Sequence, residues 1–176
     1  KNIFGIDISS KMINLAKQQM NNDRVVFEVG NINELRFKKN TFDLVLAVFL
    51  YNYTSIKEMR NSMKEIYKVL KPNGIFIFSV PHPFLPFIKN NENSGLKFNI
   101  KNNNYFEGRN KNFDGYIECV DKSTLPVKMN HKHLSDYWNI LKETGFDKIP
   151  EMHEITIKKN QFNNKIINKN IGIPLH

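Results

Sequence analysis

The sequence has little of several features that define whole classes of protein. Its single cysteine, Cys119, excludes an internal disulfide framework and a zinc site built from several cysteines. It has no long apolar run, because the stretch from Phe42 to Tyr51 contains Asp43 and is much shorter than the roughly 20 residues of a membrane-spanning helix. It shows no charged leader followed by an apolar segment and a small-residue cleavage site. These features predict a protein of a reducing, cytoplasmic compartment with no membrane span.

Arginine is also scarce, with four residues among the 26 lysines and arginines that give the chain a net charge of +9. Its 26 asparagines accompany the excess of lysine, a combination typical of an AT-rich genome. The basic residues are dispersed, and no arginine-rich stretch is interleaved with aromatic residues. The charge therefore does not predict a nucleic-acid partner.

Strand-like and helix-like segments alternate over the first 84 residues. Ser55 and Glu58 form the S-x-x-E pattern of a helix capping box, and Pro72-Asn73-Gly74 follows that helix. The alternation predicts an α/β fold with a Rossmann-like, mostly parallel sheet and helices on both faces. The expected strands are 3–6, 24–29, 43–48 and 75–80, and the expected helices are 10–20 and 55–70.

The rest of the chain is less regular. Residues 85–130 show no helical period but contain many asparagines and scattered aromatic residues. A structureless loop of this length is uncommon inside a compact domain, so we expect an insertion or lid with a function. A helix is predicted from Leu134 to Gly145, and strands are expected at Glu154–Lys158 and from Ile171.

Three segments, in this order and spacing, resemble one known family. They are the run Gly-Ile-Asp-Ile-Ser-Ser-Lys-Met-Ile at 5–13, the run Thr-Phe-Asp-Leu-Val-Leu-Ala at 41–47, and the turn Leu-Lys-Pro-Asn-Gly at 70–74 with the strand after it. The chain resembles the class I S-adenosylmethionine-dependent methyltransferases, in particular the small-molecule group that includes ubiquinone and menaquinone methyltransferases. The resemblance implies in-line transfer of a methyl group from S-adenosylmethionine to a small-molecule acceptor.

An acid at the end of an early parallel strand can accept hydrogen bonds from both ribose hydroxyls of an adenosine cofactor, and Asp7 has this position. The alternative is an acid at the start of the next helix. The resemblance assigns the ribose role to Asp7 and places Asn31 where the family often has an acid that receives the adenine amino group. The remaining cofactor contacts that it implies are Ile8 and Met12 on the adenine, Ile32 beside Asn31, and Ala47, Val48 and Phe49 at the methionine end.

Two histidines are the candidate catalytic residues. His82 lies between two prolines after the predicted fourth strand, and histidine is the commonest general base; the alternative is a turn histidine with no role. The resemblance aligns His131 with a histidine near the substrate pocket. His131 and His133 lack further ligands nearby, so no metal is expected. The expected acceptor-binding residues are His82, Phe84, Tyr105, Arg109, Tyr116, His131 and Tyr137, although the insertion's aromatic residues could equally form a small satellite core.

The sequence departs from the family pattern at its ends. No glycine-rich loop precedes Lys1, and the last expected strand stops at His176, so we expect a fragment whose remaining strands cannot form one contiguous sheet. In this interpretation residues 1–84 bind the cofactor, 85–130 are an insertion or lid over the acceptor pocket, and 131–176 complete the same domain. A tRNA base methyltransferase, a catalytically silent partner subunit and a nicotinamide-dependent dehydrogenase are the alternatives.

Overall fold

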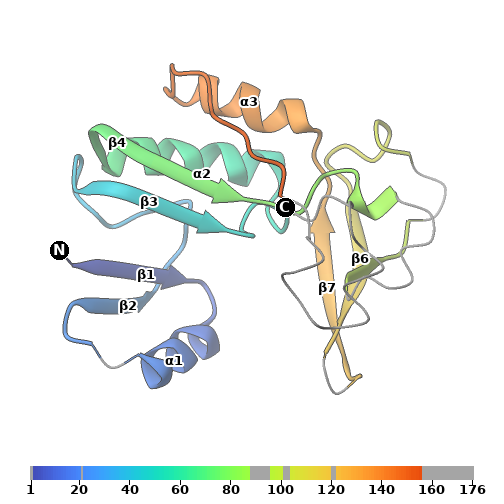
Figure 1. Ribbon diagram of the computed structural model, residues 1–176, viewed down its shortest axis with the longest axis horizontal. Helices are drawn as coiled ribbons and strands as arrows, with labels where there is room; N and C mark the ends of the chain where they lie inside the picture. Colours follow the sequence, from blue (N-terminus) through green and yellow to red (C-terminus); the bar gives the residue numbers. More distant parts are fainter. Residues whose placement is uncertain (1, 21, 88–95, 101–103, 120–121, 156–176) are drawn as a thin grey trace.

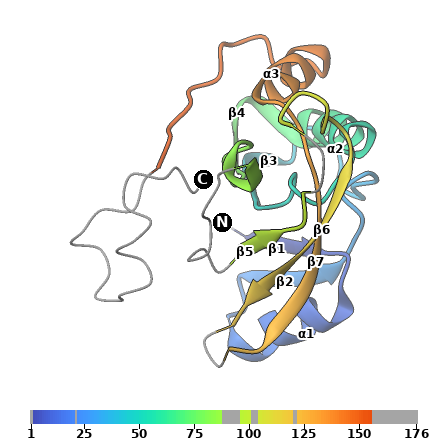
Figure 2. The same ribbon diagram turned by 90° about the vertical axis from the view of Figure 1, so that its right-hand side faces the viewer.

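A computed structural model describes residues 2–20, 22–87, 96–100, 104–119 and 122–155. The parallel strands have one helix on one side and two helices on the other, and an antiparallel sheet lies at one end of the parallel strands (Figures 1 and 2). This arrangement is the predicted α/β fold. The strand expected from Ile171 lies outside the described residues.

The chain begins with a β–α–β unit made of β1 (Ile3–Asp7), α1 (Ser10–Gln19) and β2 (Val25–Val29). The two strands are parallel. As expected from Ser9-Ser10, α1 begins with Ser9 as its N-cap, and the Ser9 hydroxyl accepts from the Met12 N–H at 3.3 Å.

A second unit consists of β3 (Phe42–Val48), α2 (Ile56–Val69) and β4 (Leu70–Ser79), again with parallel strands. The predicted capping box is present, since the Ser55 N–H donates to the Glu58 carboxylate at 2.7 Å and the Glu58 N–H donates to the Ser55 hydroxyl at 3.2 Å. β4 starts five residues earlier than predicted, because Leu70 already pairs with Phe42 before an irregular turn containing Asn73 at a φ of 62°. Asparagine tolerates this left-handed conformation better than most residues do.

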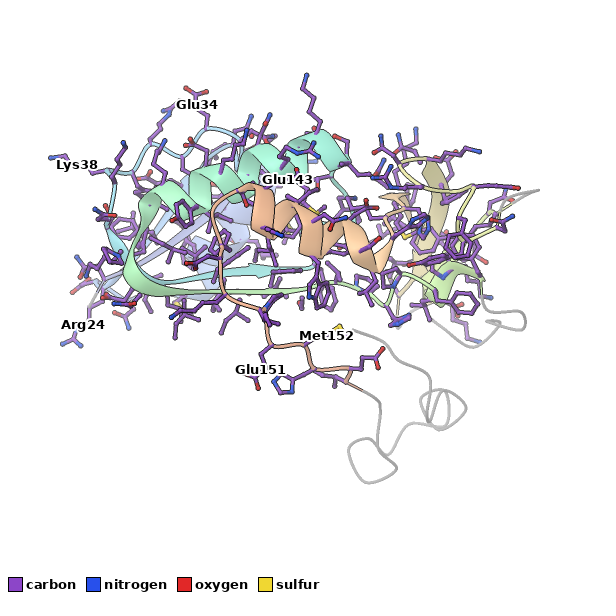
Figure 3. All side chains as sticks on the ribbon, turned by 90° about the horizontal axis from the view of Figure 1, so that it is seen from above. Arg24, Glu34, Lys38, Glu143, Glu151 and Met152 are labelled. Carbon is purple, nitrogen blue, oxygen red and sulfur yellow. The ribbon has the colours of Figure 1, made fainter. Side chains whose placement is uncertain are left out.

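In the described part of the chain the two parallel pairs form separate sheets, β1–β2 and β3–β4. This confirms the prediction that the strands do not make one contiguous sheet. The main core lies where α2 and α3 (Leu134–Glu143) pack on one face of β3 and β4, with Tyr51, Met59 and Met63 fully buried. Seen from above, α2 and α3 lie side by side, and Glu143 of α3 accepts from Arg60 of α2 at 2.8 Å (Figure 3).

The insertion contains a short helix, η1 (Leu85–Phe87), and three strands, β5 (Leu96–Phe98), β6 (Asn112–Glu118) and β7 (Thr124–Asn130). The strands form an antiparallel sheet in the order β5–β6–β7, with β6 and β7 paired over their whole length (Figure 2). The sequence analysis did not predict these strands. Their pattern is weak because β5 has only three residues and because Gly115 and Pro126 interrupt β6 and β7. Proline is tolerated in β7 because it is an edge strand.

The chain leaves α3 at Gly145, which has a φ of 110° and thus occupies the predicted helix-terminating position. The following segment runs away from the helix past Glu151 and Met152 (Figure 3). Glu154 and Ile155 are not in a strand, and the rest of the strand expected there lies outside the described residues. None of the described helices has both the length and the apolar character needed to cross a membrane.

Candidate functional site

The carboxyl ends of β1, β3 and β4 face the same side of the molecule, toward the antiparallel sheet (Figure 1). Ligands of open α/β folds bind at this edge, because the loops that follow the strands meet there. The predicted cofactor residues follow β1, β2 and β3, and His82 and Phe84 follow β4. The fold therefore brings most of the predicted site residues to one side.

Asp7 ends β1, and its carboxylate has two uses. One oxygen accepts from the Ser9 N–H at 2.7 Å, which is the helix-start role considered from the sequence. Within the described residues the second oxygen has no hydrogen-bond donor, so its lone pairs can accept from a ligand. The neighbouring apolar side chains are unusually bare, since Ile8 is 76% and Met12 is 54% exposed. An acid beside an uncovered apolar surface suits the ribose and the adenine of a nucleoside.

Asn31 lies close to Asp7. The two are brought together by Gly30, the residue between β2 and Asn31, whose N–H donates to the Asp7 carbonyl at 3.0 Å. The Asn31 amide oxygen accepts from the Asn33 N–H at 2.9 Å, and Ile32 is half-buried. An amide oxygen accepts two hydrogen bonds, so Asn31 retains capacity for a donor such as the adenine amino group. That contact stays a prediction.

The side chains of Ala47 and Val48, both predicted to contact the cofactor, lie on opposite faces of the sheet at the end of β3. Ala47 is 6% exposed and belongs to the core under α2, whereas Val48 is 67% exposed on the opposite face. Phe49 turns the chain at a φ of 50°, and its N–H donates to the Ser79 carbonyl at 3.0 Å. The Ala47 side chain thus supports the core, and Val48 is the more accessible of the two to a ligand.

The insertion forms an open cleft of about 510 Å³ beside the strand ends, which we call the aromatic cleft. Tyr105 is central to it, with its ring centroid 6.1 Å from that of Phe84 and 5.1 Å from that of Phe106. The sequence analysis identified Phe84 and Tyr105 but missed the other four lining residues, for which the only signal was their proximity in sequence to Phe84 and Tyr105. The lining residues are Phe84, Phe87, Asn104, Tyr105, Phe106 and Glu107.

Two histidines hold Tyr105 in place. Its carbonyl lies 2.8 Å from Nε2 of His131 and 3.0 Å from Nε2 of His133, and its hydroxyl accepts from the Leu134 N–H at 2.9 Å. Because a carbonyl only accepts, both imidazoles donate from Nε2. His131 is 1% exposed, and burial lowers its pKa, so its ring is neutral at pH 7. The structure places His131 behind the cleft, and its role as a base stays a prediction.

His82 has both ring nitrogens engaged. Nδ1 accepts from the Phe84 N–H at 3.2 Å, so Nε2 carries the proton, and it lies 3.1 Å from the Glu154 carboxylate. Through Phe84, His82 shapes the entrance of the aromatic cleft. A neutral His82 can act as a base only after one of these contacts opens.

The other predicted acceptor residues lie outside the cleft lining. Arg109 donates to Asp136 from Nη2 at 2.6 Å, and Asp136 in turn accepts from the His133 N–H at the start of α3. Tyr137 is buried in the core, where its ring stacks on Phe78 at 5.9 Å. Tyr116 lies on β6, with the Lys97 ammonium 5.9 Å from its ring centroid. Their contacts with an acceptor stay predictions.

Lys132 is the least expected residue of this region, since the sequence analysis assigned it no role. It is 1% exposed, and Nζ donates to the Thr54 carbonyl, to the Asn130 carbonyl at 3.0 Å and to the Asn130 side-chain oxygen at 3.1 Å. Burial lowers its pKa to about 7. Within the described ranges, no three histidine, cysteine or acidic side chains are grouped so as to hold a metal ion.

Comparisons with known proteins agree with this geometry. The model of a methyltransferase domain family matches residues 1–78. A phosphoethanolamine N-methyltransferase of Plasmodium falciparum is 28% identical over 156 residues, which are 88% of this chain and 56% of that protein. A demethylmenaquinone methyltransferase of Lactiplantibacillus plantarum is 36% identical over 92 residues, which are 49% of this chain and 38% of that protein. The chain therefore spans only about half, or less, of these relatives.

Among solved structures, an S-adenosylmethionine-dependent methyltransferase from Mesorhizobium loti superposes with a TM-score of 0.68 at 17% identity. The superposition covers 99% of this chain and 76% of that one. At this identity the likeness concerns the fold, and it includes the insertion as well as the parallel strands.

Proposed function

We propose that the chain is a class I S-adenosylmethionine-dependent methyltransferase and that it transfers a methyl group from S-adenosylmethionine to a small-molecule acceptor by in-line displacement; the match of residues 1–78 to a methyltransferase domain family supports this proposal. The observation that carries the proposal is the edge at the end of β1, where the Asp7 carboxylate stands beside the exposed side chains of Ile8 and Met12. The two named relatives support a small acceptor, because their names specify phosphoethanolamine and demethylmenaquinone as acceptors.

The residues at this edge fit the cofactor. The second oxygen of Asp7 would accept from the ribose hydroxyls, Ile8 and Met12 would cover the adenine, and Asn31 would receive its amino group. When bound, S-adenosylmethionine supplies a methyl group on a sulfonium, which departs as a neutral thioether without help from an acid. The protein's contribution is therefore alignment and exclusion of water, together with a base for acceptors that carry a proton.

The aromatic cleft is the proposed acceptor site. Its rings offer an apolar surface to an acceptor, and its backbone is fixed by the bonds of Tyr105 to the two histidines. His82 is the proposed base, because it lies two residues before the cleft residue Phe84 and its Nδ1 can accept a proton once the Phe84 N–H leaves it.

The test is calorimetric binding of S-adenosylmethionine and of NADH to the wild-type protein and to Asp7→Asn. The amide oxygen of the variant can still accept from Ser9, so the start of α1 is preserved while the charged acceptor is lost. We expect binding of S-adenosylmethionine only, weakened roughly ten- to a hundredfold in the variant because hydrogen bonds to a charged acceptor are lost. Asp114→Asn on β6, an exposed acid far from this edge in the sheet order, is the matched control. Equal affinity of Asp7→Asn and wild type would refute the ribose role.

The acceptor class is tested by methyl incorporation from labelled cofactor into bulk tRNA and into a small-molecule extract. We expect label in the small-molecule fraction. Label in tRNA would instead support the RNA-modifying alternative, and tight cofactor binding without transfer to either fraction would support a catalytically silent subunit.

A further inference from the structure

We infer that the acceptor held in the aromatic cleft is an organic ammonium compound, bound by the rings of Phe84, Tyr105 and Phe106 and by the carboxylate of Glu107. The inference rests on the proposed methyl transfer and specifies the class of its substrate. It also implies that the nitrogen of this compound is the methylated atom.

The rings of Phe84 and Phe106 present exposed surface to a ligand, whereas one face of the Tyr105 ring is covered by the His133 ring, whose centroid lies 4.8 Å away. Phe106 is 75% exposed and Phe84 is 49% exposed, so neither is buried by the protein itself. Both contact Tyr105, and Phe87 completes the wall with its centroid 6.0 Å from that of Tyr105. The faces of aromatic rings carry partial negative charge and attract cations that approach within about 6 Å.

The charges around the cleft favour a cation as well. Glu107 is exposed, and within the described residues its carboxylate has neither an ion pair nor a hydrogen-bond donor. The nearby cations are engaged elsewhere, since Arg109 is bound to Asp136 and Lys132 points at the Thr54 carbonyl. His131 behind Tyr105 is neutral, because its pKa is lowered by burial. The cleft thus has negative character on a chain whose net charge is +9.

Other classes of acceptor match this lining less well. A purely apolar acceptor would gain nothing from Glu107, and an anionic end placed against the rings would be repelled by both the carboxylate and the ring faces. In the reaction the ammonium first loses a proton to a base. The nitrogen lone pair then forms the new bond to the methyl carbon as the carbon–sulfur bond breaks, its electron pair remains on sulfur, and the product is a more highly methylated ammonium.

The test uses choline as the cationic probe and 3,3-dimethyl-1-butanol as its uncharged counterpart of the same shape, each titrated calorimetrically in the absence of cofactor. We expect choline to bind at least tenfold more tightly than the alcohol. Phe106→Leu and Glu107→Gln should each weaken choline binding roughly three- to tenfold, as expected for one cation–π or one charge contact. Both positions are exposed, so the fold does not depend on them, and Glu118→Gln on β6 is the matched control.

Equal binding of the two probes, no binding of choline, or choline affinity unchanged in Phe106→Leu and Glu107→Gln would each overturn the inference. None of these results depends on S-adenosylmethionine. A failure of the proposed methyl transfer would appear separately, as absence of S-adenosylmethionine binding to the wild-type protein or of methyl transfer to any acceptor, so the two failures are distinguishable.

Discussion

Replacing Lys132 with methionine changes both the stability of the protein and its dependence on pH. Methionine has a similar length and no charge, so it fills the volume of a side chain that is 1% exposed. It leaves three buried acceptors without their donor, namely the carbonyls of Thr54 and Asn130 and the side-chain oxygen of Asn130. An unsatisfied buried acceptor costs about 1–3 kcal/mol, and methionine also removes the cost of burying an amine, so we expect a net loss of about 3 kcal/mol at pH 7.

The pH dependence has a definite sign. Burial lowers the pKa of Lys132 from 10.5 to about 7, so between these values the unfolded chain binds a proton that the folded chain does not. The free energy of unfolding must therefore rise with pH across this window; the gain is complete above pH 10.5 and is lost as pH falls through 7. A shift of this size corresponds to at most roughly 5 kcal/mol. The oxygens around Nζ favour the charged amine, which reduces the expected rise to about 2–3 kcal/mol.

The assay is urea unfolding of the wild-type protein and of Lys132→Met at several pH values from 6.5 to 10 (about half a unit apart), followed by the fluorescence of Trp138, the single tryptophan. Other lysines and tyrosines titrate in both proteins, so the difference between the two curves isolates Lys132. We expect that difference to grow with pH in favour of the wild type. Parallel curves would refute the conclusion that burial depresses this pKa.

Two further substitutions test the residues that hold α3. Arg109→Met removes the ion-pair partner of Asp136. Burial alone would raise the pKa of Asp136, but the hydrogen bonds from Arg109 and from the His133 N–H keep it below its ordinary value. We expect the variant to lose about 1–2 kcal/mol of stability in urea unfolding, because the Arg109 side chain is half exposed, and to lose less stability than the wild type on acidification. Unchanged acid sensitivity would contradict it. Gly145→Ala places a methyl group 2.8 Å from the Tyr67 ring at a position whose φ is 110°. Thermal unfolding should therefore show that the variant is roughly 1–3 kcal/mol less stable than the wild type, and an unaltered melting temperature would contradict this.

The elements that the sequence predicted are those specified by neighbouring residues. The start of α2 was readable because Ser55 and Glu58 are three positions apart and satisfy each other's backbone groups. Its end and that of α3 were readable because Pro72-Asn73-Gly74 and Gly145 cannot continue a helix. The sheet β5–β6–β7 was not readable, since β5 has only three residues and pairs with β6 across 17 to 21 positions, and since Gly115 and Pro126 weaken the strand pattern of β6 and β7.

The same distinction holds for the candidate site. The position of Asp7 at the end of β1 could be predicted, because the strand and the residues that follow it lie in one short segment of the sequence. The aromatic cleft depends on the approach of Tyr105 to His131 and His133, which lie 26 and 28 positions further along the chain. Burial of Lys132 likewise follows from a bond to Thr54, 78 positions away. A lysine between two histidines looks solvated until that contact is known.

The bonds that bury Lys132 also fix the aromatic cleft relative to the parallel strands. Three hydrogen bonds join the insertion and its exit to the segment between β3 and α2 and to the first residue of α2. The Lys132 ammonium donates to the Thr54 carbonyl, the Asn130 N–H donates to the Asn52 carbonyl at 2.9 Å, and the Ile56 N–H donates to the Asn110 side-chain oxygen at 3.2 Å. His131 and His133, the neighbours of Lys132 in sequence, both donate to the Tyr105 carbonyl, so the segment that Lys132 anchors also holds Tyr105. Because these contacts anchor the aromatic cleft to the start of α2, the proposed acceptor site is held at a set position relative to the end of β3. Alignment of two reactants is the main contribution an enzyme makes to methyl transfer, so this anchoring is where the fold and the proposed reaction meet.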